Sequence, residues 1–133
     1  MGELIRKESN ELVAWLHNDD QKDLPKPFEN KIYLYSTHVV GTQYVEEPDK
    51  LSSINTDDVL ELYRESDNHH DQKAIVVRTK DGVKVGYIPR YDNAVFSRLM
   101  DAGKRLYAVV TYTRSDFESG YGRYIDISIY MED

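Results

Sequence analysis

The stretch of the chain that decides the fold is residues 74–90, which read AIVVRTKDGVKVGYIPR. Two runs rich in valine and isoleucine flank Asp81-Gly82, a dipeptide that favours a tight turn between antiparallel strands. Pro89 ends the second run, because proline has no backbone N–H to donate to a sheet. The stretch therefore predicts a β-hairpin.

Four further segments alternate apolar and polar residues with the two-residue period of a strand. They are 31–40 (KIYLYSTHVV), 59–64 (VLELYR), 105–114 (RLYAVVTYTR) and 123–131 (RYIDISIYM). In the last segment the period places Ile125, Ile127 and Ile129 on one face, which we expect to point into the core. Ile32 and Leu34 share a face of the first segment in the same way.

Residues 90–103 follow the period of a helix instead. Asp92 is a typical N-cap residue, and Gly103 is typical of the C-terminal stop. The stripe expected to be buried comprises Val95, Phe96, Leu99 and Met100. A second helix is expected over residues 3–18, followed by a polar linker whose prolines a helix does not easily cross.

The order of these elements predicts the architecture. Helices do not alternate with the short strands, which argues against a βαβ fold and for a mainly β, α+β protein. We expect a small, partly open, OB-like antiparallel barrel of about six strands with two helices. The expected boundaries are residues 1–30 for the N-terminal helix and linker, and residues 31–133 for the barrel. Barrels of this type bind single strands of nucleic acid across one face.

Composition excludes several classes of protein. The 133 residues fit one domain, and the absence of cysteine excludes disulfides and thiolate metal sites. The chain has neither an apolar run of about 18 residues nor the apolar centre of a signal peptide, so we expect it in the cytoplasm, away from membranes. The net charge is −7, yet residues 64–105 hold nine Lys and Arg against six Asp and Glu. A locally basic face on an acidic body suits a short single strand.

The motif that points to a family spans residues 62–90, LYRESDNHHDQKAIVVRTKDGVKVGYIPR. It closely resembles the HIRAN domain, in which a strand ending in Arg-Glu, an Asn-x-x-Asp-x-x-Ala-Ile-x-Val element and a Val-Gly-Tyr/His-Ile-Pro turn follow one another. The matching residues are Arg64, Glu65, Asn68, Asp71, Ala74, Ile75, Val77, Val85, Gly86, Tyr87, Ile88 and Pro89. The segments 40–44 (VGTQY) and 99–104 (LMDAGK) match as well, so the resemblance covers about residues 31–112.

The resemblance implies a module that captures the 3′-hydroxyl end of single-stranded DNA, as this domain does at the N-terminus of a fork-remodelling, helicase-like ATPase. It implies that Tyr44 stacks on a terminal base and that Asp71 accepts a hydrogen bond from the 3′-hydroxyl. A carboxylate accepts a hydrogen bond from a hydroxyl group but repels a 3′-phosphate. The resemblance further implies Asn68 at the loop or the sugar, Tyr87 in the pocket, and Lys73 and Arg90 at phosphates.

Two positions depart from the family pattern, although both are expected at the nucleic-acid site. His70 stands where the family has another stacking aromatic residue, and Gln43 stands where a basic residue is common beside the stacking tyrosine. Lys73 also replaces a common asparagine. The resemblance therefore implies a recognisable but altered pocket.

Structural interpretations compete with these roles. Asp71 and Asn68 have the side chains that cap turns in loops, and Tyr44 fits a half-buried strand aromatic. Gly86 fits a bulge at which two backbones approach each other.

We expect no enzymatic activity, cofactor or metal. His69, His70 and Asp71 lack a further His or Cys nearby, and the chain has no phosphate-loop, nucleophile-elbow or zinc-protease motif. The leading hypothesis is a single-stranded-DNA-binding module in DNA repair or replication-fork processing, which reaches a repair or helicase protein through its N-terminal helix. One alternative is a protein-interaction module that keeps the fold without affinity for DNA, which the net charge and the departures at His70 and Gln43 favour. Another is a small metal-dependent nuclease.

Overall fold

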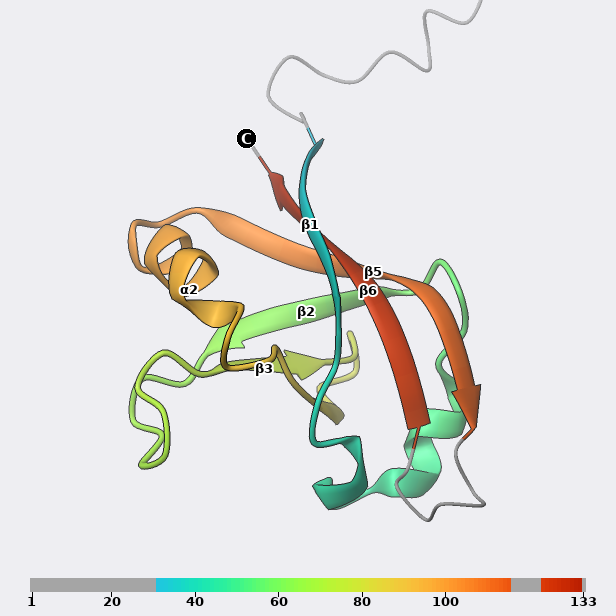
Figure 1. The fold of residues 1–133 in the computed structure, drawn as a ribbon. Coiled ribbons are helices and arrows are strands. Elements are labelled where there is room, and N and C mark those ends of the chain that lie inside the picture. Colours follow the sequence, from blue (N-terminus) through green and yellow to red (C-terminus); the bar gives the residue numbers. More distant parts are fainter. Residues whose placement is uncertain (1–30, 116–122, 133) are drawn as a thin grey trace, which may run out of the picture. The chain divides into compact units, whose positions relative to one another are not determined.

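The computed structural model describes residues 31–115 and 123–132 (Figure 1). Its strands are β1 (Lys31–His38), β2 (Val59–Arg64), β3 (Ile75–Arg78), β4 (Lys84–Tyr87), β5 (Arg105–Ser115) and β6 (Arg123–Glu132). Helix α2 spans Asn93–Asp101, and short 3₁₀ helices span Thr42–Tyr44 and Pro48–Ser53. All the predicted strands and the helix predicted within residues 90–103 are therefore confirmed. The expected helix and linker over residues 1–30 lie outside the described residues, and the domain boundary stays a prediction.

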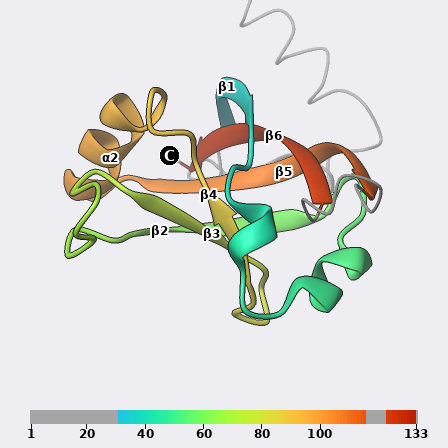
Figure 2. The same ribbon diagram turned by 60° about the horizontal axis from the view of Figure 1, so that its bottom comes forward.

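The strands form one antiparallel sheet in the order β1-β6-β5-β2-β3-β4. The sheet curls so that the chain leaving β1 returns to β4 at the opposite edge (Figure 2). There Val40 and Tyr87 form an isolated bridge, in which each N–H donates to the other's carbonyl oxygen at 2.9 Å. A single bridge replaces a continuous ladder at this edge, so the barrel is partly open, as predicted.

Gly86 permits this closure. A Cβ atom at this position would collide with the carbonyl oxygen of Val40 and would lie 2.7 Å from Cγ1 of Val39. A side chain would therefore force the β4 backbone away from the chain that leaves β1. The interpretation of Gly86 as a point of close backbone approach is confirmed.

The core lies inside the curled sheet. Ile125, Ile127 and Ile129 of β6 are each 0% exposed, which confirms that they point inward. Burying a side chain of this size contributes about 1.5–3 kcal/mol. The edge strand β1 is less protected: Leu34 packs against the core, whereas Ile32 keeps 39% of its surface exposed. The face that these two residues share is thus partly buried at Leu34 and exposed at Ile32.

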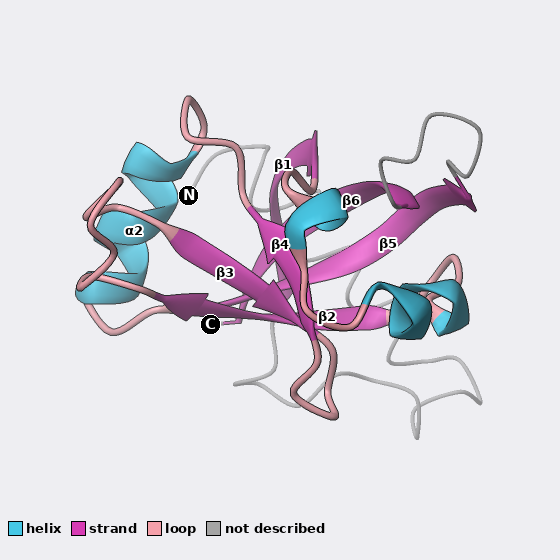
Figure 3. Ribbon diagram, turned by 90° about the horizontal axis from the view of Figure 1, so that it is seen from below, coloured by secondary structure: helices cyan, strands magenta, loops and turns pink. Residues whose placement is uncertain are grey.

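Helix α2 packs against β2 and β5 at one end of the sheet (Figure 3). Phe96 is buried, and Leu99 and Met100 pack against the core, as predicted. The prediction that Val95 belongs to the buried stripe is wrong, because Val95 is 63% exposed. The side of α2 that faces the core instead includes two buried polar residues, Asn93 and Ser97, together with Phe96, Leu99 and Met100. The prediction misplaced the buried side of the helix because it considered apolar residues alone.

The two ends of α2 differ in how well the sequence predicted them. Asp92 precedes the helix, but among the described residues its carboxylate does not cap the first turn. Its Oδ2 instead accepts a hydrogen bond from the hydroxyl of Thr37 in β1, at 2.7 Å. Gly103 ends the helix as predicted: its φ is +92°, and its N–H donates to the carbonyl of Met100 at 2.9 Å.

Candidate nucleic-acid interface

The loop between β2 and β3 is shaped by Asn68. The side-chain Oδ1 of Asn68 accepts hydrogen bonds from the backbone N–H groups of His70 and Asp71, at 2.8 and 3.1 Å. Its Nδ2 donates to Oε1 of Glu65 at 2.8 Å. Both ends of the amide are thus occupied within the loop. The interpretation of Asn68 as a residue that shapes the loop is therefore correct.

Arg64 ties the far side of the same loop to α2. Its guanidinium donates to the carbonyl oxygens of Gln72 and Ala74, at 3.0 and 2.8 Å. The same group forms a bidentate pair with Asp101, in which Nε lies 2.8 Å from Oδ1 and a terminal nitrogen lies 3.2 Å from Oδ2. The planar fork of arginine suits this geometry. The sequence contained Arg64 as a motif residue but gave no sign of this supporting role.

Asp71 presents a carboxylate that is held at both oxygens. Its Oδ1 accepts from the backbone N–H of Lys73 at 2.9 Å, and its Oδ2 accepts from Nδ2 of Asn93 at 2.7 Å. The guanidinium Nε of Arg90 lies 4.0 Å from Oδ2. The interpretation of Asp71 as a turn cap is thus also correct, although the cap accounts for only one of its two oxygens.

The charge of Asp71 follows from these contacts. Burial alone raises the pKa of this carboxyl, but the hydrogen bonds from Lys73 and Asn93 and the charges of Arg90 and Lys73 outweigh it. The pKa of Asp71 is therefore below its ordinary value, and the group is ionised at neutral pH. An ionised carboxylate accepts hydrogen bonds and cannot donate them.

Asn93 is a site residue that the sequence analysis missed. It lies in the first turn of α2, is 2% exposed, and reaches Asp71 from 22 positions further along the chain. No spacing rule connects these two positions. The signal in the sequence was weak: Asn93 stands three residues before Phe96 of the predicted stripe, and a buried amide there needs a hydrogen-bond partner.

A hollow of about 420 Å³ opens beside this carboxylate. Four of the predicted site residues line it, namely His70, Asp71, Lys73 and Arg90. They are joined there by His69, Gln72, Asn93 and Ala94. We call this site the loop hollow. It combines one ionised acceptor with two cationic side chains, of which Arg90 is 77% exposed.

Tyr87 lies in a supporting network and not in the lining of the loop hollow, as far as the described residues define that lining. Its hydroxyl donates to Oε1 of Glu65 at 2.7 Å and accepts from Nζ of Lys84 at 2.9 Å. Glu65 in turn holds Asn68, so the network supports the loop that carries Asp71. Burial raises the pKa of Glu65, but the hydrogen bonds from Tyr87 and Asn68 and the charge of Lys84 bring its pKa below the ordinary value.

Tyr44 and Gln43 lie on the 3₁₀ helix Thr42–Tyr44, apart from the residues described as lining the loop hollow. Tyr44 is 83% exposed, so the interpretation of a half-buried aromatic is wrong. The hydroxyl of Thr42 donates to the carbonyl of Arg123 at 2.8 Å and fixes this short helix to β6. The structure therefore offers an exposed tyrosine ring on an anchored support.

The described residues contain neither a cluster of metal ligands nor a helix that could span a membrane. In residues 31–115 and 123–132, no three His, Cys, Asp or Glu side chains lie close enough together to hold a metal ion. Over the same residues, no helix has the length and apolar character that crossing a membrane requires.

Comparison with known proteins gives a family and a fold. The model of the HIRAN domain matches residues 32–132. A crystal structure of a protein from Lactobacillus plantarum is 33% identical, with a TM-score of 0.69, over 79% of this chain and 99% of that chain. No curated protein matches the chain.

Two structures of the HIRAN domain of human HLTF share the fold. Its crystal structure is 20% identical, with a TM-score of 0.56, over 77% of this chain and 81% of that chain. Its NMR structure is 20% identical, with a TM-score of 0.51, over 77% and 80%. Because the family model matches residues 32–132, well over half of the chain, the chain belongs to the HIRAN domain family, whose domains are generally nucleic-acid-binding modules.

Proposed function

We propose that this domain binds single-stranded DNA and receives the free 3′ end in the loop hollow. The observation that carries the proposal is the Asp71 carboxylate, which lines this hollow with both oxygens oriented by hydrogen bonds.

The carboxylate has capacity left for a ligand. Two carboxylate oxygens together offer about four acceptor positions, and Lys73 and Asn93 use one on each oxygen. A 3′-hydroxyl donates into a remaining position. A 3′-phosphate brings only negative charge and acceptor oxygens, so Asp71 rejects it. The lowered pKa of Asp71 keeps this discrimination intact at neutral pH.

The cations of the loop hollow serve the backbone of the strand. Arg90 contacts Asp71 only at 4.0 Å and is largely exposed, so its guanidinium is available to a phosphate. Lys73 lines the same hollow, and its backbone N–H donates to Asp71. The side-chain ammonium of Lys73 is therefore available to a second phosphate. His70 supplies a flat ring at the same rim.

Tyr44 acts as a stacking platform outside the loop hollow. Its exposed ring suits a base because stacking needs an accessible face and no particular sequence. Gln43 beside it adds a neutral hydrogen-bonding side chain without a charge for phosphate. The proposal includes a place in DNA repair or replication-fork processing, in the cytoplasm, with a repair or helicase protein bound through residues 3–18.

The experiment is a fluorescence-anisotropy titration with single strands of about 12 nucleotides, within the usual site size of OB-like folds. One strand ends in a 3′-hydroxyl, one in a 3′-phosphate, and one carries the phosphate at its 5′ end. We expect the 3′-phosphate to weaken binding at least about tenfold, or 1.4 kcal/mol, and the 5′-phosphate to change it little. Equal affinity for both 3′ ends would reject recognition of the end. If the chain binds none of the strands, DNA binding is rejected and the alternative of a protein-interaction module remains.

A further inference from the structure

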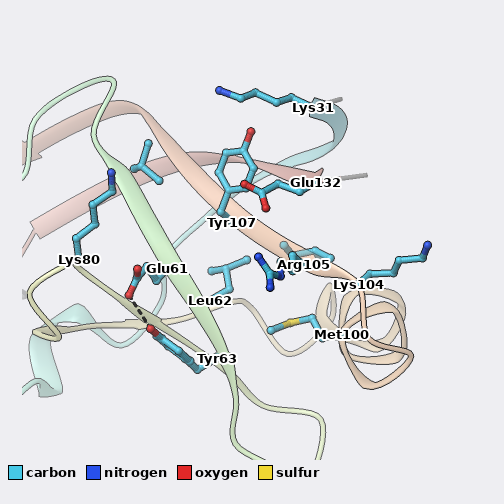
Figure 4. Close-up of a pocket in the computed structure, with 12 residues that line it drawn as sticks. Lys31, Glu61, Leu62, Tyr63, Lys80, Met100, Lys104, Arg105, Tyr107 and Glu132 are labelled. Atoms are coloured by element: carbon cyan, nitrogen blue, oxygen red, sulfur yellow. Dashed lines mark hydrogen bonds between the residues drawn. The ribbon is translucent and has the colours of Figure 1, made fainter. Parts of the chain in front are cut away.

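A second and larger hollow, of about 700 Å³, opens where β2 and β5 separate (Figure 4). The pairing between these strands extends to Glu61 opposite Tyr107. Strand β2 continues to Arg64 and β5 already begins at Arg105, so the two strands diverge beyond the last pair. Met100 of α2 lines the opening. We call this site the strand hollow.

The strand hollow collects positive charge on an acidic protein. Its lining includes the cations Lys31, Lys80, Lys104 and Arg105, against the carboxylates of Glu61 and Glu132. None of the four cations forms an ion pair with another residue in the described part of the chain. The chain as a whole has a net charge of −7. Unpaired cations around one hollow of such a protein favour an anionic ligand.

Aromatic rings stand among these cations. Tyr63 is 47% exposed, and its hydroxyl donates to Oε1 of Glu61 at 2.6 Å, which fixes the ring and occupies one carboxylate oxygen. Tyr107 also lines the hollow, and its ring is held by stacking on Tyr130, with ring centroids 5.6 Å apart and planes 14° apart. Fixed tyrosine rings between lysine and arginine side chains are the combination that proteins use to bind single strands.

We propose that the strand hollow binds the body of a single-stranded nucleic acid, with phosphates at Lys31, Lys80, Lys104 and Arg105 and a base on Tyr63. The inference rests on the proposed function and extends it from the end of the strand to its interior. Helix α2 lines both hollows, with Asn93 at the loop hollow and Met100 at the strand hollow. Seven residues of helix separate them by about 10 Å, a distance that a short strand spans. An acidic peptide would use the cations but has no need of the rings.

The test compares two double variants that remove the same charge. Lys80→Gln with Lys104→Gln removes two cations from the strand hollow. Lys50→Gln with Arg98→Gln removes two cations that lie outside both hollows, and serves as the control. Each protein is titrated with strands of about four and about 12 nucleotides that end in a 3′-hydroxyl, at about 50 and 200 mM salt. Tyr63→Leu and Tyr63→Phe form a second matched pair, because phenylalanine keeps the ring.

We expect the strand-hollow variant to bind the long strand about fivefold to tenfold more weakly than the control, with a smaller salt dependence. The short strand, which fills only the loop hollow, should bind both variants equally. Tyr63→Leu should weaken binding of the long strand at least about fivefold, and Tyr63→Phe, which keeps the ring but loses the hydrogen bond to Glu61, should weaken it less. If the native chain binds the long strand but both double variants bind it alike, the strand hollow does not bind nucleic acid, and the proposed function stands. If the native chain binds no strand, both the proposed function and this inference are overturned. If a polyglutamate peptide displaces the long strand as well as an unlabelled copy of that strand does, the assignment to nucleic acid is wrong.

Discussion

Replacing Asn93 with alanine removes the side chain that holds Asp71 from the helix. Asn93 is 2% exposed and donates to Oδ2 of Asp71 at 2.7 Å. A hydrogen bond to a charged group contributes about 1.5–3 kcal/mol. The Asp71 side chain is itself 19% exposed, so water can replace part of the lost bond. We therefore expect Asn93→Ala to lower the free energy of unfolding by about 1.5 kcal/mol at neutral pH.

The loss should depend on pH in one direction. The pKa of Asp71 is lowered in the folded protein, so its interactions stabilise the fold above the ordinary aspartate pKa of about 3.9. This stabilisation disappears as the pH falls through the folded-state pKa, because the carboxyl becomes protonated in both states. The difference between the native chain and Asn93→Ala should therefore be full at neutral pH and should shrink below a pH of about 4.

Urea unfolding at neutral and acidic pH measures this difference, and an NMR titration of the Asp71 carboxyl measures its pKa. Ser97→Ala is the matched control, because Ser97 is equally buried on α2 and donates within the helix to the carbonyl of Ala94 at 3.0 Å. Its cost should not change with pH. The reasoning is refuted if Asn93→Ala costs the same at both pH values, or if the pKa of Asp71 does not rise in that variant.

Three further predictions concern other parts of the domain. Gly86→Ala should lower the free energy of unfolding by about 2–4 kcal/mol, because its Cβ would overlap Val40 and break the bridge that closes the barrel; Gly82→Ala, with open space around it, should cost about 1 kcal/mol in the same urea experiment. Tyr44→Ala should weaken single-strand binding by about 1–3 kcal/mol without changing the thermal midpoint, since the ring is exposed; an unchanged anisotropy curve removes Tyr44 from the site. Arg64→Met should speed hydrogen exchange of the Ala74 amide by loosening the loop, and unaltered exchange would show that the clamp is dispensable.

The strands were predictable because their residues obey a local rule. The two-residue period of residues 123–131 predicted that Ile125, Ile127 and Ile129 share the buried face of the strand, and the structure agrees. The turn at Asp81-Gly82 needed only the left-handed backbone of Gly82, whose φ is +87°. Neither feature depends on a contact with a distant part of the chain.

The parts that failed depend on contacts between distant segments. Asp92 has a side chain that often caps helices, but its carboxylate accepts a hydrogen bond from Thr37 of β1 instead. Thr37 lies in a distant segment of the chain, so no local rule predicts this contact. Val95 was expected in the core because it is apolar, but it is exposed. Two residues earlier, the polar Asn93 is buried and donates a hydrogen bond to Asp71.

The residues that line the candidate site were predictable in the same way, whereas the contacts that support them were not. The resemblance named Asp71, Lys73, His70 and Arg90, which the fold brings into one hollow. It could not separate Tyr87, whose hydroxyl supports the loop through Glu65, from the residues that line the hollow. Such roles follow from hydrogen bonds made in three dimensions.

The central claim is that the charge of Asp71 recognises the 3′ end, and a double comparison tests it most directly. The native chain and Asp71→Asn are each titrated with strands that end in a 3′-hydroxyl and in a 3′-phosphate. Asparagine keeps the shape and one acceptor oxygen for the N–H of Lys73, but it replaces the second oxygen, which accepts from Asn93, and it removes the charge. We predict that the native chain prefers the hydroxyl end by at least about tenfold and that Asp71→Asn narrows this preference. An equal preference in the two proteins would contradict the claim.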